Sequence, residues 1–487
     1  MAFIKKSLIV GTIALLFIVL YFCPFIYGKV IYVDDDAFGA NNGSSWENAY
    51  MYLQDALADA SDSDKSVEIR VAQGIYKPDL GAGNVPGDRE ASFRLINDVT
   101  ISGGYAGINA NDPNARDIEL YETTLSGDLN GDDVEDPNRA ENSYHVLIGS
   151  GTNVTAVLDG FIVAGGAANG PELDSDPVYM DRLRVGGGMY NWKGSPTLKN
   201  CSFNDNTAEG AGGIYNYKGD PTLIKCTFSD NSAIGSGGMH NQEGSPILSN
   251  CSFNDNAAMA GGGMGTYKGS PILTNCTFSD NWGWDGGGMF NQESSPALTN
   301  CIFSGNSDGG MWIQRGSAIL TNCTFSGNWG AIYHYNSDDP NSSLILTNCI
   351  IWHNAPNTIP QTSTIMYSNI QGGWEGEGNI DEDPLFVNPG YWADKNDPYI
   401  VVAANDSNAI WIDGDYHLKS SAGRCDPNSQ SWVFDDVTSP CIDAGDPFSP
   451  VMYEPHPRGC IINMGAYGGT EEASKSPFGC SYEADSD

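Results

Sequence analysis

Apolar and polar positions recur with a fixed period between Gly186 and Asn354. Seven times a leucine is followed, three residues later, by a cysteine and then by an aromatic or aliphatic residue two positions further on. The first four spacings are 25 residues and the last two are 22 and 26, between the cysteines Cys201, Cys226, Cys251, Cys276, Cys301, Cys323 and Cys349. A period of this size is typical of proteins built from stacked repeats.

Each repeat contains three short β-compatible pieces separated by turn residues. In the first repeat these pieces are Gly187 to Asn191, a piece centred on Leu198, and Cys201 to Phe203. They are too short for ordinary helices. Three strands in each 25-residue unit are the layout of a parallel β-helix, whose coils lie about 4.8 Å apart. The sequence therefore predicts an all-β solenoid in which neighbouring coils share one continuous core.

The repeat also predicts which side chains face the core. Side chains alternate along a strand, so the cysteine and the phenylalanine share an inward face, and Met189 and its equivalents fill the inward position of the first strand. The chain must turn between leucine and cysteine, at Asn200, Lys225, Asn250, Asn275, Asn300, Asn322 and Asn348. Asparagine tolerates left-handed geometry, so we expect an asparagine ladder along this corner. The seven cysteines are expected to be buried thiols, because parallel Cβ vectors suit a disulfide poorly.

The flanks differ from the repeats and divide the chain. We expect an export signal or uncleaved anchor at 1–28, an N-terminal cap at 29–66, irregular coils at 67–186, regular repeats at 187–354 and a loop-rich C-terminal cap at 355–487. The N-terminal cap contains a predicted helix with Asn48 as its N-cap. The C-terminal region holds Cys425, Cys441, Cys460 and Cys480, which predict two disulfides in any of three connectivities.

The charge of the chain limits its partners. A formal net charge of −38, from 23 basic and 61 acidic residues, excludes nucleic acid and disfavours anionic membranes. It makes calcium a plausible ligand. Asp128, Asn130 and Asp132 place oxygens at alternate positions, as a calcium loop does, but Asp133 and Arg139 stand where an EF-hand needs Gly and Glu. We expect calcium at these three residues or, as the alternative, an acidic turn, and no other cofactor.

The outward positions of the first strand are unusually aromatic. They are Tyr190, Trp192, Tyr215, Tyr217, Tyr267, Phe290, Trp312, Tyr333 and Tyr335. Rings spaced by coils of about 4.8 Å can stack on sugar faces, so this stripe predicts binding of a polysaccharide or cell-surface glycan. The alternative is that cross-strand aromatic pairs only stabilise the sheet.

Charged residues follow the stripe by one position, at Lys193, Lys218, Glu243, Lys268, Glu293 and Arg315. A Lys or Arg here could act as the base of a lyase on acidic sugars. The alternative is a set of ion pairs on a solvated face.

The repeat Asn-Cys-x-Phe-x-x-Asn with Gly-Gly-Gly-Met resembles right-handed β-helix proteins of the pectin lyase-like superfamily. It is also similar to the repeats of chlamydial polymorphic outer-membrane proteins. The flanking segments Tyr32 to Ala37, Ser439 to Asp446 and Ile462 to Thr470 resemble exported β-helix proteins of planctomycetes. The resemblance implies a right-handed helix that is secreted or on the cell surface. It implies no single activity, because the superfamily includes lyases, hydrolases and adhesins.

No three aspartates are expected in one groove at coil spacing, so a polygalacturonase-like hydrolase is not favoured. We therefore expect an exported, monomeric, non-enzymatic protein that binds glycans or partner surfaces along the aromatic stripe. The alternative is a polysaccharide lyase or another carbohydrate-active enzyme acting on acidic polysaccharide. A purely structural spacer on the cell surface is the third hypothesis.

Overall fold

The computed structural model describes residues 28–480, apart from 65, 134–138, 172–181, 336–341 and 357. The export signal or anchor expected at 1–28 lies outside the described residues, except for Gly28. Over the described ranges, every helix is too short or too polar to cross a lipid bilayer.

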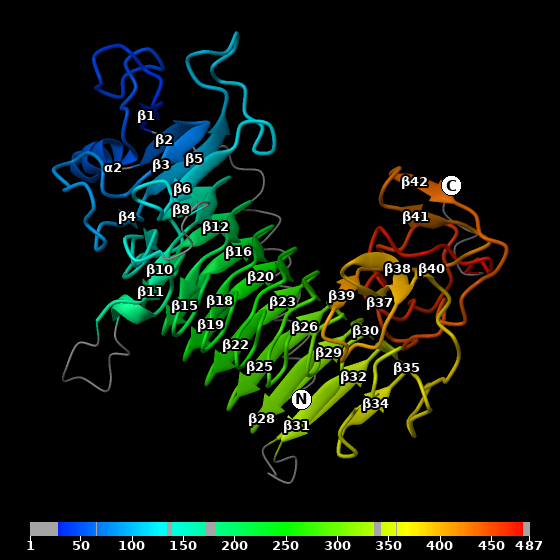
Figure 1. The fold of residues 1–487 in the computed structure, drawn as a ribbon. Coiled ribbons are helices and arrows are strands. Elements are labelled where there is room, and N and C mark those ends of the chain that lie inside the picture. Colours follow the sequence, from blue (N-terminus) through cyan, green and yellow to red (C-terminus); the bar gives the residue numbers. More distant parts are fainter. Residues whose placement is uncertain are drawn as a thin grey trace, which may run out of the picture.

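Three long parallel sheets form the body of the molecule (Figure 1), and here they are numbered by their order within a coil. Sheet 1 contains β4 (Phe93–Arg94), β7 (Leu147–Ile148), β11 (Met189–Trp192), β15 (Ile214–Tyr217), β19 (Met239–Gln242), β22 (Met264–Tyr267), β25 (Met289–Gln292), β28 (Met311–Gln314) and β31 (Ile332–Tyr335). Sheet 2 contains β1 (Lys29–Val33), β2 (Val67–Ala72), β5 (Val99–Tyr105), β8 (Val157–Asp159), β12 (Thr197–Lys199), β16 (Thr222–Ile224), β20 (Ile247–Ser249), β23 (Ile272–Thr274), β26 (Ala297–Thr299), β29 (Ser317–Thr321), β32 (Ser343–Thr347) and β34 (Thr364–Met366).

Sheet 3 contains β3 (Gly74–Tyr76), β6 (Thr123–Ser126), β9 (Ile162–Ala164), β13 (Ser202–Asn204), β17 (Thr227–Ser229), β21 (Ser252–Asn254), β24 (Thr277–Ser279), β27 (Ile302–Ser304), β30 (Thr324–Ser326), β33 (Ile350–Trp352) and β35 (Asn369–Ile370). A short fourth sheet, between sheets 3 and 1, is made of β10 (Ala167–Ala168), β14 (Thr207–Ala208) and β18 (Ser232–Ala233). A single 3-10 turn, η1 (Arg182–Arg184), precedes β11 in the described chain.

Residues one period apart pair directly, which confirms the predicted stacking. Met189 pairs with Ile214, Leu198 with Leu223, and Phe203 with Phe228. The phenylalanine rings of successive coils stack with centroids 4.5–5.1 Å apart. All seven repeat cysteines are buried free thiols, as expected.

The corner between sheets 2 and 3 has the predicted left-handed geometry, with φ between 49° and 57° at all seven positions. Side chains bond along this corner only in part: Asn275 donates to Asn250 and Asn348 to Asn322, both at 3.3 Å. A continuous ladder lies elsewhere, inside the coil, at Asn206, Asn231, Asn256, Asn281, Asn306, Asn328 and Asn354. Each Nδ2 donates to the Oδ1 of the next at 2.8–3.0 Å.

Helix α2 (Leu53–Asp62) covers the N-terminal end of the solenoid (Figure 1). Its apolar face, which includes Leu53 and Leu57, joins the main core. The prediction of Asn48 as N-cap is wrong. The cap position is Tyr52, which makes no side-chain capping bond, while Asn48 Oδ1 accepts the Ala40 N–H at 2.9 Å in the preceding turn.

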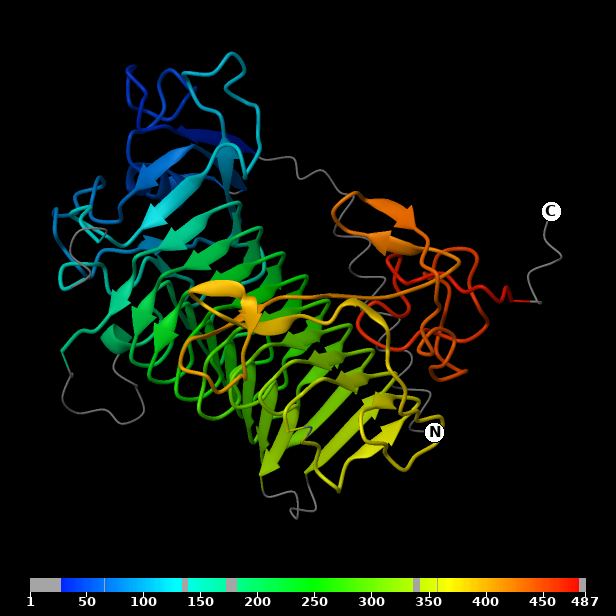
Figure 2. The ribbon, with the colours of Figure 1, turned by 45° about the vertical axis from the view of Figure 1, so that its right-hand side comes forward.

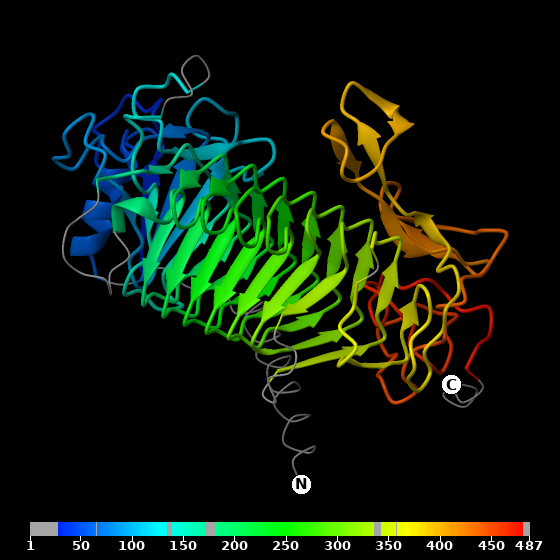
Figure 3. The same cartoon turned by 60° about the horizontal axis from the view of Figure 1, so that its bottom comes forward.

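The C-terminal region lies beside the last coils (Figure 2 and Figure 3). Residues just after β35 close the end of the core through Trp374, and the chain then folds back over the outer face of sheet 3. There Phe386 and Met464 pack with Ile350. The strands of this region are β36 (Phe386–Asn388), β37 (Tyr391–Asp394), β38 (Asp397–Val401), β39 (Ala409–Ile412), β40 (Asp415–Leu418), β41 (Arg424–Asp426) and β42 (Ser431–Val433).

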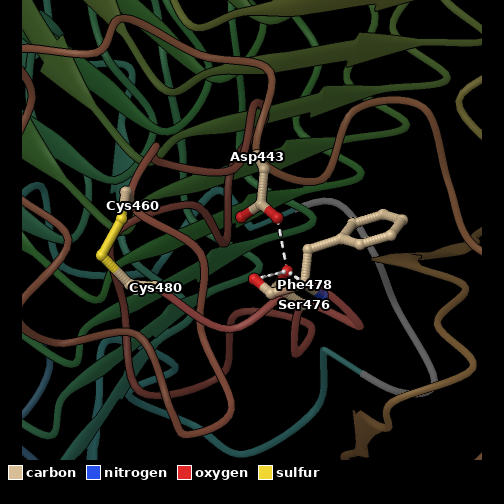
Figure 4. The surroundings of a disulfide bond; sticks show 5 residues. All are labelled: Asp443, Cys460, Ser476, Phe478 and Cys480. Carbon is tan, nitrogen blue, oxygen red and sulfur yellow. Dashed lines mark hydrogen bonds between the residues drawn. A yellow bond between two sulfur atoms is a disulfide. The ribbon is translucent and has the colours of Figure 1, made fainter. Parts of the chain in front are cut away.

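One disulfide joins the C-terminal segment to itself, between Cys460 and Cys480 (Figure 4). Cys425 and Cys441 are free thiols, so the prediction of two disulfides is wrong. Cys441 is buried against sheet 3, where Asn369 Nδ2 lies 3.0 Å from its sulfur. Beside the disulfide, Ser476 donates a hydrogen bond to Asp443 and accepts the Phe478 N–H at 2.9 Å (Figure 4).

Candidate functional site

The aromatic stripe lies on the outer face of sheet 1, as its alternation predicts. Ile214 belongs to the main core, whereas Tyr215 belongs to a separate cluster on the opposite face of the strand. The stripe consists of two columns. The first includes Tyr190, Tyr215, His240, Phe290, Trp312 and Tyr333, and the second includes Trp192, Tyr217, Tyr267 and Tyr335. The ring of His145, which precedes β7, stacks on Tyr190 with centroids 5.3 Å apart.

The rings of these columns stack on one another along the solenoid axis. In the first column, Tyr190 and Tyr215 have centroids 6.1 Å apart, and Tyr215 and His240 have centroids 5.4 Å apart, with nearly parallel planes. In the second, Trp192 and Tyr217 are 4.1 Å apart. The faces that a sugar would need are therefore covered by neighbouring rings in these coils.

Burial divides the stripe into an upper part, on β11, β15 and β19, and a lower part, on β22, β25, β28 and β31. Tyr215 and Tyr217 are buried beneath the loops that hold Val185 and Ala211. Tyr215 donates to Gln242 Oε1 at 2.9 Å, and burial raises the pKa of its hydroxyl. In the upper coils, Tyr190 and Trp192 are half-buried; in the lower coils, Tyr267, Phe290, Trp312 and Tyr333 are half-buried and Tyr335 is exposed. Only the lower part of the stripe offers an extended accessible aromatic surface.

The charged column beside the stripe forms ion pairs. Lys218 lies 3.3 Å from Glu243, and Glu293 lies 2.8 Å from Arg315 and 3.8 Å from Lys268. The ammonium groups also lie over the preceding rings, 4.8 Å from the Tyr217 centroid, 4.9 Å from that of Tyr267 and 5.8 Å, for Lys193, from that of Trp192. The ion-pair interpretation of this column is thus confirmed for Lys218, Lys268 and Arg315.

Three exposed tryptophans, which the repeat pattern did not predict, lie on the turn between sheets 3 and 1. The side chains of Trp282, Trp284 and Trp329 are 47%, 59% and 37% exposed. Together they form what we call the tryptophan ridge. Trp282 and Trp329 each follow a buried ladder asparagine, at a position where other repeats have Thr, Ser or Ala. The Asn-Trp-Gly sequence at 281–283 and 328–330 is the signal that could have revealed them.

The ridge differs from the stripe in what surrounds its rings. Trp282 pairs with the small Ala257 in the coil before it, and Ser307 occupies the equivalent position in the coil after it. Its aromatic neighbour Trp284 meets it edge-on, with centroids 6.1 Å apart. The same loop continues to Gly286, which lies close to Trp312 of the stripe. A Cβ atom added to Gly286 would lie only 2.9 Å from the Cβ of Trp312. The ridge therefore borders the accessible lower part of the stripe.

A column of aspartates at coil spacing, which the sequence analysis did not single out, follows the edge of sheet 3. Asp205, Asp230, Asp255 and Asp280 each occupy the left-handed position before a ladder asparagine. Burial, with the neighbouring Asp255, raises the pKa of the Asp280 carboxyl to about 7, against the effect of the Trp411 backbone N–H. The signal was the aspartate in the Phe-x-Asp-Asn sequence, which recurs every 25 residues.

The acidic loop brings two of its three predicted calcium ligands into one cluster. Carboxylate oxygens of Asp128, Asp132, Asp133 and Glu141 all lie within 4.8 Å of one another. Asn130 instead donates to Asp132 Oδ2 at 2.9 Å. Asp132, Asp133 and Glu141 each have a buried oxygen with no hydrogen-bond partner. Several carboxylates with unsatisfied oxygens fit the ligand preference of calcium.

An amide completes this cluster. Asn142 is fully buried, and its Nδ2 donates to Asp133 Oδ2 at 2.9 Å and to Gly165 O at 2.6 Å. These two acceptors fix the orientation of the amide, because the flipped amide would place its oxygen against both. The Asn142 Oδ1 is thus left buried and without a hydrogen-bond partner. A buried carbonyl oxygen in this state is a further potential metal ligand.

Comparison with known proteins places the chain by its fold. Residues 180–283 and 242–372 match the family described as right handed beta helix region, and residues 396–445 match the family described as disaggregatase related. The crystal structure of pectate lyase Pel9A superposes with a TM-score of 0.53 at 14% identity, over 90% of this chain and 96% of that one. The fold is a right-handed parallel β-helix.

Two other solved structures are more distant. The superposition with a pectin methylesterase covers 70% of this chain and 93% of the methylesterase chain, at 12% identity and a TM-score of 0.33. The superposition with a rhamnogalacturonan lyase covers 74% of this chain and 91% of the lyase chain, at 12% identity and a TM-score of 0.28. No curated protein matched the chain.

Proposed function

We propose that this protein is an exported, monomeric, non-enzymatic protein that binds a polysaccharide or cell-surface glycan on the outside of its β-helix. The observation that carries the proposal is the tryptophan ridge, whose rings are exposed and whose Trp282 has small residues at the equivalent positions of the neighbouring coils. The binding surface continues from the ridge onto the lower part of the stripe, where Tyr267, Phe290, Trp312, Tyr333 and Tyr335 are accessible. Broad aromatic faces are suited to the apolar faces of sugar rings.

The charges on sheet 1 favour binding over lyase chemistry. A base that abstracts a sugar proton must reach the substrate without a competing partner. The cations of this face are instead held by Glu243 and Glu293 or lie over aromatic rings.

A carbohydrate-active enzyme acting on acidic polysaccharide is the second candidate function. It is favoured by one observation, the interacting carboxyls of Asp255 and Asp280, one of which has a pKa of about 7 and could donate a proton at neutral pH.

The ridge is tested with the double variant Trp282→Ala with Trp284→Ala in affinity electrophoresis against a panel of polysaccharides. Each lost ring contact is worth about 1 kcal/mol. The double variant should therefore bind at least about tenfold more weakly to any polysaccharide that retards the wild type in the gel. Phe448→Ala is the matched control, because Phe448 is 91% exposed but lies in the C-terminal region. Equal retardation of the double variant and the wild type would refute the assignment of the ridge.

The enzymatic candidate is tested on the same panel. A lyase creates an unsaturated product that absorbs in the ultraviolet, and a hydrolase releases reducing ends. We expect neither signal from the wild type. A signal that disappears in Asp280→Asn would replace binding by catalysis as the function.

We further propose that calcium binds the acidic loop through Asp128, Asp132, Asp133 and Glu141, with the Asn142 amide oxygen as an additional ligand. Support comes from the mutual proximity of the four carboxylates and from the unpartnered, fully buried Asn142 Oδ1. Calcium would neutralise charges that repel one another in this loop, where Arg139 Nε lies 3.7 Å from Asp133. Its role would be to hold the loop against the coil, far from the ridge in sequence.

A further inference from the structure

A cavity of about 420 Å³ opens at the corner between sheets 2 and 3, in the N-terminal half of the solenoid. Ile118 and Glu119, from the loop after β5, form one wall, and coil residues from β9, β13 and β17 form the other. The volume falls in the range of roughly 300–1,000 Å³ that small-molecule sites occupy. The cavity shares no residue with the stripe, the ridge or the acidic loop.

Lys225 lines this cavity and is the exception in the corner column. The other six corner positions are asparagine, which tolerates left-handed geometry better than lysine does. At φ 53°, Lys225 therefore occupies a conformation that its side chain does not favour. Two corner positions line the cavity, Asn200 and Lys225, and at the second a long cationic side chain replaces the amide.

The ammonium of Lys225 has no partner to explain its presence. Within the part of the chain that the structure describes, its Nζ lies more than 4.0 Å from every carboxylate, and its side chain makes no hydrogen bond. By contrast, Lys218, Lys268 and Arg315 on sheet 1 all pair with glutamates. Lys225 is exposed, and in a chain with a net charge of −38 its ammonium is available to pair with an anionic group.

The rest of the lining suits a polyhydroxylated ligand. Ser202 and Thr227 present hydroxyls, and Phe161 and Ile118 supply apolar surface. Thr227 Oγ1 accepts from Ser252 at 3.2 Å, so its own hydrogen is available to donate. The cavity thus mixes polar and apolar lining in similar measure, and a sugar ring carries both kinds of surface.

Two carboxylates lie near the cavity, and one of them, Asp159, is already paired. Asp159 accepts a hydrogen bond from Asn200 at 2.7 Å and pairs with Arg116 at 3.2 Å. Glu119 is exposed on the opposite wall from Lys225, where it can accept hydrogen bonds from hydroxyls. The cavity thus offers one cation for an anionic substituent and one carboxylate for sugar hydroxyls.

We propose that this cavity binds a single sugar residue bearing one anionic group, a carboxylate or a sulfate, with Lys225 paired to that group. The corner continues past the cavity through Asn250 and Asn275 toward the C-terminal segment, which begins to cover it at Asn300. The sugar can therefore belong to a longer chain that lies along this corner. The proposal goes beyond the glycan-binding function of the ridge, because a different surface and a different chemistry carry it.

The test compares the wild type with Lys225→Asn, which installs the residue found at the other six corners. This variant should fold with an unchanged or higher melting temperature, because asparagine suits the positive φ. Binding is measured by saturation-transfer NMR and calorimetry with galacturonic acid, galactose 6-sulfate and galactose. The three probes share the galactose ring and differ in whether they bear a carboxylate, a sulfate or no anionic group. They therefore show which anionic group the cavity binds.

The wild type should bind one of the two anionic probes at least about tenfold more tightly than galactose, and Lys225→Asn should reduce that affinity to the galactose level. Lys199→Asn is the matched control, because Lys199 is on β12 outside the cavity lining. Equal affinity for galactose and both anionic probes, no binding of either anionic probe at millimolar concentration, or unchanged affinity of Lys225→Asn would overturn the proposal. The Trp282 and Trp284 double variant should retain this binding, so failure of the ridge and failure of the cavity are distinguishable.

Discussion

The buried asparagine ladder should contribute more to stability than the exposed asparagine corner, and Asn256 allows both to be tested within one coil. The Asn256 Nδ2 donates to Phe228 O, Asn254 O and Asn281 Oδ1 at 2.9–3.0 Å. Its Oδ1 accepts from the backbone N–H and the Nδ2 of Asn231 at 3.2 and 3.0 Å. Asn256→Ala removes all of these hydrogen bonds without changing the backbone.

The expected loss follows from the number of contacts. Each buried hydrogen bond contributes about 1 kcal/mol net, and an orphaned buried group such as the Asn231 N–H costs about 1–3 kcal/mol. Asn256→Ala should therefore lower the free energy of unfolding by about 5 kcal/mol. Asn250→Lys is the control, since Asn250 is exposed and the chain itself has lysine at the preceding corner. It should change stability by less than about 1 kcal/mol.

Urea unfolding followed by circular dichroism measures both variants, with the slope of the transition compared as well as its midpoint. A solenoid can unfold in segments, so a changed slope in Asn256→Ala would locate the loss in the coils next to it. If Asn256→Ala and Asn250→Lys shift the midpoint equally, the buried ladder does not hold the coils together, and the stacking argument fails.

Two further predictions concern acidic groups. Because the pKa of Asp280 rises from 3.8 to about 7 on folding, the folded state binds its proton more tightly, and the wild type should lose stability relative to Asp280→Asn as pH rises from about 4 to about 7. Between pH 5 and pH 8 the difference should grow by about 2.7 kcal/mol in urea titrations, and a constant difference would contradict the raised pKa of Asp280. Calcium at one hundred times its dissociation constant should stabilise the wild type by about 2.7 kcal/mol in thermal unfolding, with reversal by chelator. Glu141→Gln should weaken this effect and the exposed Asp112→Asn should not; an equal calcium response in all three proteins would place the ion elsewhere.

The solenoid was predictable because its signal is repeated. Every coil presents the same leucine, cysteine and phenylalanine at the same spacing, so an error in one coil is corrected by the next. The inward and outward faces of sheet 1 followed from alternation alone. The buried ladder was not predicted, because asparagine was expected at turns rather than in the core, although buried amides are stable when every group has a partner.

The candidate sites were harder to predict because they depend on what covers a surface. Alternation placed Tyr215 outward, but the loops that bury it come from neighbouring coils and carry no periodic signal. The C-terminal region folds back over sheet 3, and nothing in its composition indicates which face it covers. Glu141 and Asn142 come close to Asp128 only in the folded structure, so a metal-binding motif of fixed spacing could not identify them.

The geometry of a parallel β-helix limits where an aromatic residue can meet a sugar. Strand spacing of about 4.8 Å brings rings at equivalent positions into face-to-face contact, so a continuous aromatic column stacks on itself. Trp192 and Tyr217 show this outcome, with centroids 4.1 Å apart. A ring keeps a free face only where its neighbours along the column are small, as Ala257 and Ser307 are for Trp282. Interruption of the repeat, rather than the repeat itself, therefore marks the surfaces available to a ligand, and Trp282 and Lys225 are both interruptions of this kind.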